Sequence, residues 1–516
     1  MDNIPRVLII GSGPSGLVLA LALAKNGIQT RIIEKRQEPA PGQRGAGIMV
    51  DASPIVPRTL ELFGQLGIVD QVLGEAVPVP RIRRYRLSDV TEVVQEIEMS
   101  PSTKPSSTTP FPNLLMLGQD RLEKILISAL REHGGNVEYG IEMKTLTGSK
   151  ECVNVKLIHH GPNNSIEEES QYDWVIGADG EKSEVRKRAG LTFDGESRAD
   201  SLLVGDTSVE GLGPEYVCLS LRPTEKAGLF SFITGGNQVN LSEVGSLQPG
   251  NSPRMPCGKI APLAGNFFSR YTMDVLVPVR DSLSLAWKLN LVVKGLASSE
   301  LLESYTEERI PVVAEMLNLS TEYLDKALNQ CPGEGGEWSR DGALHQLGIN
   351  YRWSSIVLSD SGCKKTPPID SYGRVATDVL QPGDRAPDSS GICLVETRAT
   401  IPLVISRLSD VYKTTHHTVV IFTGVVDAKT VLMELSRYSG VLIQIVAVVP
   451  SEGYTSGSLP STVDFVFTDT DGRVSQTYTE EESGLIIVRP DGMIGAMLRS
   501  SSSVHDYFSG IFLLSD

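Results

Sequence analysis

The amino-acid sequence predicts an α/β fold that begins with a parallel sheet, and three observations support this prediction. Arg6–Ile10 is a short run in which four apolar residues, three of them β-branched, follow one arginine, as expected of a buried strand. The glycine-rich stretch Gly11–Gly16 follows at once and leads into a strongly apolar segment, residues 17–25. A second strand-like run, Gln29–Ile33, ends on Glu34. The predicted order is therefore strand, glycine turn, helix and strand.

The three glycines of Gly11-x-Gly13-x-x-Gly16 each have a physical task in a dinucleotide-binding turn. The first permits the tight turn, the second lets the backbone approach a pyrophosphate, and the third lets the helix pack on the strand. The helix that starts here, with Ser15 in its first turn, points free N–H groups at phosphate. Glu34 stands eighteen positions after Gly16, where a carboxylate can accept hydrogen bonds from ribose hydroxyls. We therefore predict a Rossmann-like dinucleotide site.

Composition narrows the classes of partner. The chain has 516 residues, which suggests about three domains. Its 47 basic and 63 acidic residues give a formal net charge of −16, which disfavours nucleic acid or an anionic membrane surface as a partner. The six cysteines include no Cys-x-x-Cys pair, so we expect reduced thiols and no metal site. Glycine and proline break the apolar N-terminal stretch, so we expect no signal peptide, no membrane span and a cytoplasmic protein.

Two more polar side chains are candidates for the same ligand. Arg44 lies in a turn-rich stretch and could bind phosphates bidentately, although a solvated loop arginine is an equally good interpretation. Asp179 follows a buried strand, Tyr172–Ile176, and precedes Gly180, so its carboxylate could accept a ribose or ribitol hydroxyl. Taken alone, a plain Asp-Gly turn is the simpler interpretation of that pair.

The segments between these motifs predict two helices and a second sheet. Apolar residues at helical spacing run from Pro57 to Leu66, and another helix opens at Gln119 with Asp120 as its N-cap. Residues 81–97 form two strand-like runs with one wet face, and we expect further short strands in 191–279. These runs depart from the nucleotide-binding pattern, so we expect a separate sheet that carries a substrate pocket.

Two other regions have a distinct character. Residues 99–112 are rich in proline, serine and threonine, which predicts a mobile loop without packed structure. From residue 347 onward, short strands alternate with helical segments and glycine or proline turns. This alternation predicts a small α/β domain of its own.

With its motifs in this order, the chain resembles the FAD-dependent aromatic hydroxylases, flavoprotein monooxygenases of the para-hydroxybenzoate and phenol hydroxylase type. The motifs are Gly11-x-Gly-x-x-Gly16, Glu34, Arg44, Arg58-Thr-Leu-Glu61, Gln119, Gly177-Ala-Asp-Gly180, Leu285-Ala-Trp-Lys-Leu289 and Ser304-Tyr-x-x-Glu-Arg-x-Pro311. The tail, with Gln381–Pro387 and Val488-Arg-Pro-Asp-Gly492, is similar to the thioredoxin-like domain of the phenol hydroxylase branch.

The resemblance implies an activity and a set of cofactor contacts. NAD(P)H would reduce bound FAD, and one oxygen atom of O₂ would hydroxylate or epoxidise a phenolic or polycyclic small molecule in secondary metabolism. It identifies no catalytic residue, and it leaves open a homodimer. The implied cofactor-binding residues are Gly11, Gly13, Ser15, Gly16, Glu34, Lys35, Arg44, Gln119, Asp179 and Gly180.

The resemblance also implies a division into domains. A discontinuous FAD-binding domain, 1–80 and 113–190, would be interleaved with a β-sheet substrate domain, 81–112 and 191–279. A helical region, 280–346, would complete the FAD-binding domain. The remainder, 347–516, would be the thioredoxin-like α/β domain. Because Cys363 and Cys393 lie thirty positions apart, we expect this last domain to be redox-inert.

The chain departs from the family at one place. The family has a Gly-Asp-x-x-His segment shortly before its Trp-Lys-Leu helix, and residues 266–280 contain no such segment. Loss of its contacts to ribitol and flavin ring predicts weak FAD binding. The alternatives to a working hydroxylase are a non-redox descendant that binds or cyclises a small molecule, and a truncated or mis-spliced form.

Overall fold

The computed structural model contains helices and strands from residue 7 to residue 509. The described residues are 7–39, 55–79, 81–86, 89–98, 100–148, 152–162, 164–191, 201–207, 216–221, 229–235, 238–245, 277–329, 345–360, 369–374, 379–398, 405–452, 454–479 and 483–513. Within these ranges no helix is both long enough and apolar enough to cross a membrane.

The first sheet contains the nucleotide-binding motif. Its strand order is β11-β1-β2-β7, and every neighbouring pair is parallel. The strands are β1 (Val7–Ile10), β2 (Thr30–Glu34), β7 (Val137–Tyr139) and β11 (Trp174–Gly177). The helix α1 (Pro14–Lys25) connects β1 to β2, so the predicted order of strand, glycine turn, helix and strand is confirmed.

Alternate residues of β1 face two different cores, because side chains alternate along a strand. Val7 and Ile9 pack with helices α1, α2 (Pro57–Leu66), α4 (Gln119–Glu132) and α6 (Val277–Val293). Leu8 and Ile10 pack instead against a three-stranded antiparallel sheet. Its strands are β8 (Ile141–Gly148), β9 (Val153–His160) and β10 (Ser165–Tyr172). Strand β1 is therefore buried on both faces.

Both predicted helices are present, with one correction. Helix α2 ends where Gly67 adopts a left-handed conformation (φ 75°), and α3 (Val69–Glu75) follows. Helix α4 begins at Gln119 as predicted, but its N-cap is Gly118 and not Asp120. Asp120 lies in the first turn, with its Oδ2 3.4 Å from Lys124 Nζ. A negative charge in the first turn interacts favourably with the positive end of the helix dipole, whether or not the residue caps the helix.

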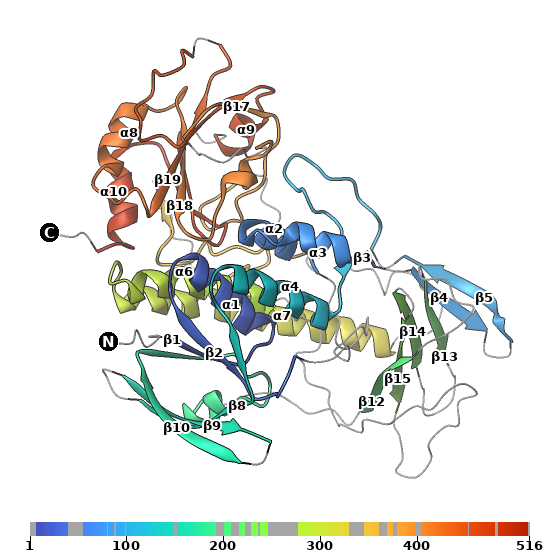
Figure 1. Ribbon diagram of the computed structural model, residues 1–516. Helices are drawn as coiled ribbons and strands as arrows, with labels where there is room; N and C mark the ends of the chain where they lie inside the picture. The colour runs from blue at the N-terminus through green and yellow to red at the C-terminus, as the bar shows by residue number, and fades with distance from the viewer. Residues whose placement is uncertain are drawn as a thin grey trace.

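A second, six-stranded sheet combines two segments that are far apart in the sequence. Its order is β12-β15-β14-β13-β4-β5. The strands are β4 (Arg81–Arg86), β5 (Asp89–Ile97), β12 (Ser201–Thr207), β13 (Tyr216–Leu221), β14 (Leu229–Gly235) and β15 (Gln238–Gly245). The two segments join where β4 pairs in parallel with β13, with Arg81 opposite Tyr216. Figure 1 shows β4 and β5 extending this sheet away from the helices.

A mixed seven-stranded sheet forms the C-terminal part, in the order β16-β22-β21-β18-β19-β20-β17. The strands are β16 (Leu358–Ser359), β17 (Ile392–Thr397), β18 (His417–Phe422), β19 (Ile443–Val449), β20 (Phe465–Asp469), β21 (Leu485–Val488) and β22 (Ile494–Leu498). Helices α8 (Ala428–Leu435) and α10 (Ser502–Ser509) pack on one face, and α9 (Arg473–Tyr478) packs on the other (Figure 1). Both faces are covered, and the central strands β18, β19 and β21 are accordingly mostly apolar, with His417, Thr418 and Gln444 as the polar exceptions.

The loop over residues 100–113 lacks helix and strand, as predicted, but it is tied to the C-terminal part. The Thr108 carbonyl accepts hydrogen bonds from Arg385 Nη1 and from the Asp388 backbone N–H, each at 3.3 Å. The Ser106 carbonyl accepts from Arg407 Nη1 at 3.4 Å. The interpretation as a loop without packed structure was therefore wrong for these residues. The composition of a segment does not show which distant residues it contacts, and here Arg385, Asp388 and Arg407 of the C-terminal part donate hydrogen bonds to its backbone carbonyls.

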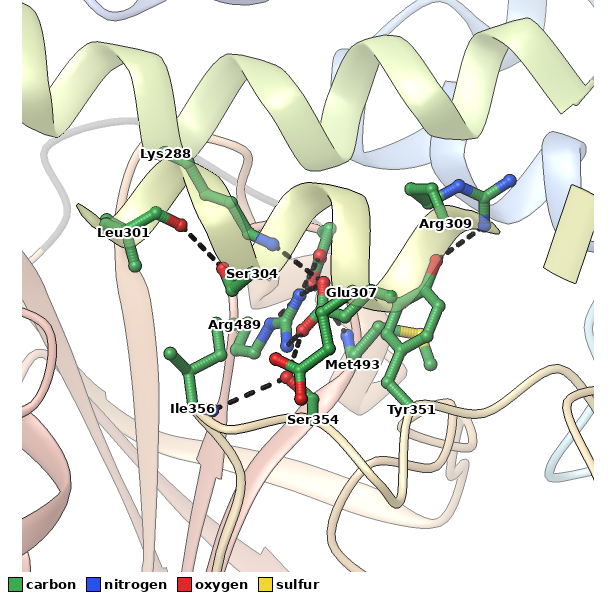
Figure 2. Close-up of polar contacts among 12 residues, drawn as sticks. Lys288, Leu301, Ser304, Glu307, Arg309, Tyr351, Ser354, Ile356, Arg489 and Met493 are labelled. Carbon is green, nitrogen blue, oxygen red and sulfur yellow. Dashed lines mark hydrogen bonds and ion pairs between the residues drawn. The ribbon is translucent and has the colours of Figure 1, made fainter. Parts of the chain in front are cut away.

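A buried ionic network joins the C-terminal sheet to α6 and to α7 (Glu303–Asn329). Glu308 of α7 accepts from Lys288 Nζ at 2.7 Å and from Arg489 Nη1 at 2.6 Å. Arg489 also donates to Asp491, which in turn accepts from Trp287 Nε1 at 3.2 Å. Figure 2 shows Lys288 and Arg489 converging between the two helices and the C-terminal strands. Trp287, predicted to lie in the core, is 2% exposed.

The network is balanced in charge, which makes its burial tolerable. Lys288, Glu308 and Arg489 have side chains that are 0% exposed. Two cations face two carboxylates, so the cluster carries no net charge. Burial alone would raise the pKa of Glu308, but Arg489 and Lys288 outweigh it and hold that pKa below its ordinary value. The cluster therefore remains ionised, and removing one member leaves an uncompensated charge.

We predict that Glu308→Gln destabilises the protein by about 3 to 5 kcal/mol, because it leaves two buried cations facing one carboxylate. The urea midpoint measures this loss. Glu303→Gln is the matched control, because Glu303 is exposed in the first turn of the same helix. Equal midpoints for the two variants would contradict the role we assign to the network.

Stability should also fall in acid because of His417. Burial, with smaller contributions from Arg489 and His416, lowers the pKa of His417 to about 3. Its ring lies among Trp287 and three aromatic residues of the C-terminal helix region, Tyr507, Phe508 and Phe512. Between pH 6.5 and 3 the unfolded chain binds a proton that the folded chain does not. The free energy of unfolding therefore drops by about 1.4 kcal/mol per pH unit below 6.5.

Urea unfolding between pH 7 and pH 4 tests this prediction against a His417→Phe variant. Phenylalanine keeps an aromatic ring at this position and cannot take up the proton. The variant should lose stability less steeply as the pH falls. Parallel curves for the two proteins would show that His417 does not govern the acid response.

Candidate functional site

The motifs predicted for nucleotide binding meet at one edge of the parallel sheet. The carboxyl ends of parallel strands lie on the same side, which is where ligands bind in such sheets. The glycine turn follows β1, Glu34 ends β2, and the Ala178–Asp179 turn follows β11. Two backbone hydrogen bonds hold these ends together, Gly11 N to Ile33 O at 2.9 Å and Ala178 N to Ile10 O at 2.7 Å.

The three glycines of the turn meet different surroundings. A Cβ on Gly11, whose φ is +107°, would lie 2.2 Å from the Ala178 carbonyl oxygen. A Cβ on Gly16 would lie 2.1 Å from the Gly11 carbonyl oxygen. At Gly13 a Cβ would meet nothing within 4 Å. Two glycines therefore allow close backbone packing, and the middle one faces open space that a pyrophosphate could enter.

The N-terminus of α1 faces this space. Gly13 is its N-cap and has no side chain to cap the first turn, and Pro14 occupies the first helical position. Ser15 lies in that turn, and its carbonyl accepts from the Ser282 hydroxyl of α6 at 2.8 Å. The N-terminal part of α6 is thereby held against the turn. The N–H groups at the start of α1 and the positive end of its dipole suit an anion.

Glu34 is 8% exposed and accepts four hydrogen bonds. Ser12 donates from its backbone N–H and from its hydroxyl, both at 3.1 Å. Arg36 donates from its backbone N–H at 3.1 Å and from Nη2 at 3.4 Å, and its Nε forms an ion pair with Glu34 Oε1 at 3.0 Å. Burial raises the pKa of Glu34, but the donors from Arg36 and Ser12 outweigh burial and leave that pKa below its ordinary value. Glu34 is therefore a carboxylate at neutral pH, as ribose recognition requires.

Gln119 reaches the same region from the start of α4. Its Nε2 donates to Glu123 Oε1 at 2.9 Å, one turn further along the helix. Glu123 is 4% exposed, and its Oε2 lies 3.7 Å from Arg36 Nη2. Our sequence interpretation missed Ser12, Arg36 and Glu123. The sequence did contain a signal for Glu123, because a carboxylate four residues after Gln119 on the apolar face of a helix lies next to that glutamine.

Asp179 makes local contacts only among the described residues. Its carboxylate accepts from the Ser183 hydroxyl at 2.5 Å and from the backbone N–H groups of Glu184 and Val185 at 2.7 and 3.2 Å. These bonds organise the start of α5 (Glu184–Arg188). Gly180 has φ +78°, as a tight turn requires. The Asp-Gly turn is thus present, and a contact from Asp179 to a cofactor stays a prediction.

The remaining predicted positions divide into two groups. Lys35 is exposed directly after β2. Lys187 lowers the pKa of Glu184, and the charge of Lys35 makes a smaller contribution in the same direction. Arg44 lies outside the described residues, as does the part of residues 266–280 that precedes α6. The structure therefore places the glycine turn, Glu34, Gln119 and Asp179, and it does not describe Arg44 or the residues that precede α6.

Comparison with known proteins gives a family match and several relatives. The family model described as FAD binding domain matches residues 5–247 and 277–320, which is more than half of the chain. The interruption falls where the sequence lacks the Gly-Asp segment. The chain is 27% identical over 549 residues to a flavin-dependent monooxygenase of Mycobacteroides abscessus, covering 98% of this chain and 99% of that protein.

Two solved structures share the fold over the whole chain. One is the flavin-dependent monooxygenase PieE in complex with FAD and substrate, with a TM-score of 0.74 and 19% identity, covering 99% of each chain. The other is aklavinone-11 hydroxylase with FAD and aklavinone, with a TM-score of 0.71 and 22% identity, covering 98% of each chain. At these identities the likeness concerns the fold.

We predict that Glu34→Ala weakens FAD binding by about 1 to 3 kcal/mol, because it removes a charged hydrogen-bond acceptor. Equilibrium dialysis with FAD measures the change. Glu38→Ala is the control, since Glu38 is an exposed acidic residue four positions away. An unchanged FAD affinity in Glu34→Ala would refute the assignment of Glu34 to the site.

Proposed function

This chain belongs to the FAD binding domain family of flavin-dependent monooxygenases, and from this premise we propose that it uses NAD(P)H and O₂ to hydroxylate or epoxidise a phenolic or polycyclic small molecule. The observation that carries the proposal is the open space beside Gly13 at the N-terminus of α1, next to Ser12, whose backbone N–H donates to Glu34. We place the reaction in secondary metabolism, because one structural neighbour was solved with aklavinone.

The described residues fit the adenosine and pyrophosphate parts of FAD and the adjoining ribityl chain. The first turn of α1 would bind the pyrophosphate, the Glu34 carboxylate would accept hydrogen bonds from the adenosine ribose, and Gln119 would contact the ribityl region. The chemistry that FAD supplies when bound is acceptance of a hydride and activation of O₂ for oxygen transfer. The protein contributes binding, orientation and exclusion of water.

We propose the domain division predicted from the sequence, with the Rossmann-like FAD-binding domain interleaved with the substrate sheet. The parallel pairing of β4 with β13 supports it, because this pairing joins the segments 81–112 and 191–279. Helices α6 and α7 would complete the FAD-binding domain. We further propose a cytoplasmic protein, because its six scattered cysteines are typical of reduced thiols in a cytosolic setting. A homodimer stays a prediction that sedimentation can test.

We propose that residues 347–516 form a thioredoxin-like domain without redox activity. The unit β18–α8–β19 followed by the antiparallel pair β21–β22 and helix α10 supports the fold. Cys393 is exposed and free, and Cys363 lies outside the described residues. The full chain should reduce a protein disulfide no faster than its Cys363→Ser/Cys393→Ser variant. Faster reduction by the unsubstituted chain would overturn this part of the proposal.

Because the Gly-Asp segment is absent, we expect FAD to bind reversibly and to be lost on desalting. Several charge-assisted hydrogen bonds are missing from the family pattern, at about 1.5 to 3 kcal/mol each. Such losses change the dissociation constant by orders of magnitude. The measurement is the visible flavin absorbance before and after desalting. Stoichiometric retention of flavin would show that residues 266–281 build the ring site by another route.

Activity is tested with FAD in excess. We expect NAD(P)H to bleach bound FAD without oxygen, and a substrate of the phenolic or polycyclic class to accelerate NAD(P)H oxidation in air. The product should contain one ¹⁸O atom from ¹⁸O₂. Saturable FAD binding without any reduction by NADH or NADPH would contradict the proposal and favour the non-redox descendant.

A further inference from the structure

Glu123 is a buried carboxylate, and burial of a carboxylate is unfavourable without compensating partners. It is a carboxylate on the buried side of α4, beside Leu122 and Leu126, and it is 4% exposed. A carboxylate so placed is costly unless hydrogen-bond donors and a cation compensate it. Those partners come from two other parts of the site, Gln119 on one side and Arg36 on the other.

The contact with Gln119 determines which end of the amide faces away. An ionised carboxylate can only accept hydrogen bonds, so the group 2.9 Å from Glu123 Oε1 must be the NH₂ of the amide. Gln119 Oε1 is then the atom that the side chain can offer to another donor. A hydroxyl of a bound cofactor is such a donor. With a neutral partner at position 123 the amide could turn over, because an amide or a hydroxyl can also donate.

The contact with Arg36 extends to the other border of the site. Arg36 lies between two carboxylates, with Nε 3.0 Å from Glu34 Oε1 and Nη2 3.7 Å from Glu123 Oε2. Its side chain is only 20% exposed, so both carboxylates act on it with little screening by water. Glu123 thereby restricts the guanidinium that in turn orients Glu34.

We propose that Glu123 is a positioning residue of the cofactor site, which fixes the Gln119 amide with Oε1 outward and holds Arg36 against Glu34. The inference rests on the proposed FAD site. It joins the residue assigned to the adenosine ribose and the residue assigned to the ribityl region in one hydrogen-bonded unit. Glu123 itself touches neither part of the cofactor in this scheme.

A double-mutant cycle separates positioning from a merely structural role. Equilibrium dialysis gives FAD dissociation constants for the unsubstituted chain, Glu123→Gln, Gln119→Ala and the double variant. We expect Glu123→Gln to weaken FAD binding about tenfold, the loss of one charge-assisted interaction. In the Gln119→Ala background the same substitution should weaken binding at least about threefold less, because one of the groups that Glu123 positions is gone.

Two controls complete the experiment. Glu132→Gln removes an exposed carboxylate from the end of the same helix and should leave the dissociation constant unchanged. Urea unfolding of Glu123→Gln without FAD reports whether the substitution harms the fold itself. If the loss of affinity is equal in both backgrounds, Glu123 does not act through Gln119 and the inference is overturned.

The failure of this inference can be told from the failure of the proposed function. No saturable binding of FAD by the unsubstituted chain would overturn the proposed function and this inference with it. Saturable binding by that chain, with an unchanged dissociation constant in Glu123→Gln, would overturn only the role of Glu123.

Discussion

Parallel pairing of β1 with β2 on one side and β11 on the other brings the parts of the nucleotide site together. The three strands come from residues 7–10, 30–34 and 174–177, and the parallel arrangement puts all three carboxyl ends at one edge. The turn after β1 then lies against the turn after β11, closely enough that Gly11 has no room for a side chain. Register between these strands, more than any single side chain, sets the positions of Gly13 and Glu34.

Helix α6 provides a second constraint on the position of the glycine turn. Helix α6 contributes Ser282 to the glycine turn and Lys288 to the buried ionic network. The network connects that helix to the C-terminal sheet through Arg489 and to α7 through Glu308. Because a buried ion pair is costly when incomplete, all members have to be placed together. The C-terminal part is thus coupled energetically to a helix that borders the cofactor site.

The structure also shows what two of the family motifs, Arg58-Thr-Leu-Glu61 and the Arg-Pro-Asp-Gly turn, do in the fold. Arg58 and Glu61 of α2 form an ion pair at 2.8 Å, and Arg58 Nη2 donates to the carbonyl of Asp491 at 2.9 Å. Glu61 accepts from Arg385 at 2.8 Å. The Arg-Thr-Leu-Glu motif therefore binds the C-terminal part, together with the Arg-Pro-Asp-Gly turn. Several motifs that are distant in sequence serve one interface between the helices and the C-terminal sheet.

The local features of this protein could be predicted from its amino-acid sequence: the strand, glycine turn, helix and strand, the acidic residue at the end of β2, and the helix that starts at Gln119. These depend on side-chain periodicity and on backbone freedom within a few residues, which a sequence shows directly. Only tertiary packing placed Arg36 beside Glu123, and only packing brought Lys288, Glu308 and Arg489 into one buried cluster. It also decided the attachment of the proline-rich loop. The physical reason is that burial makes charge pairing compulsory, and the partners come from segments that only the packing brings together.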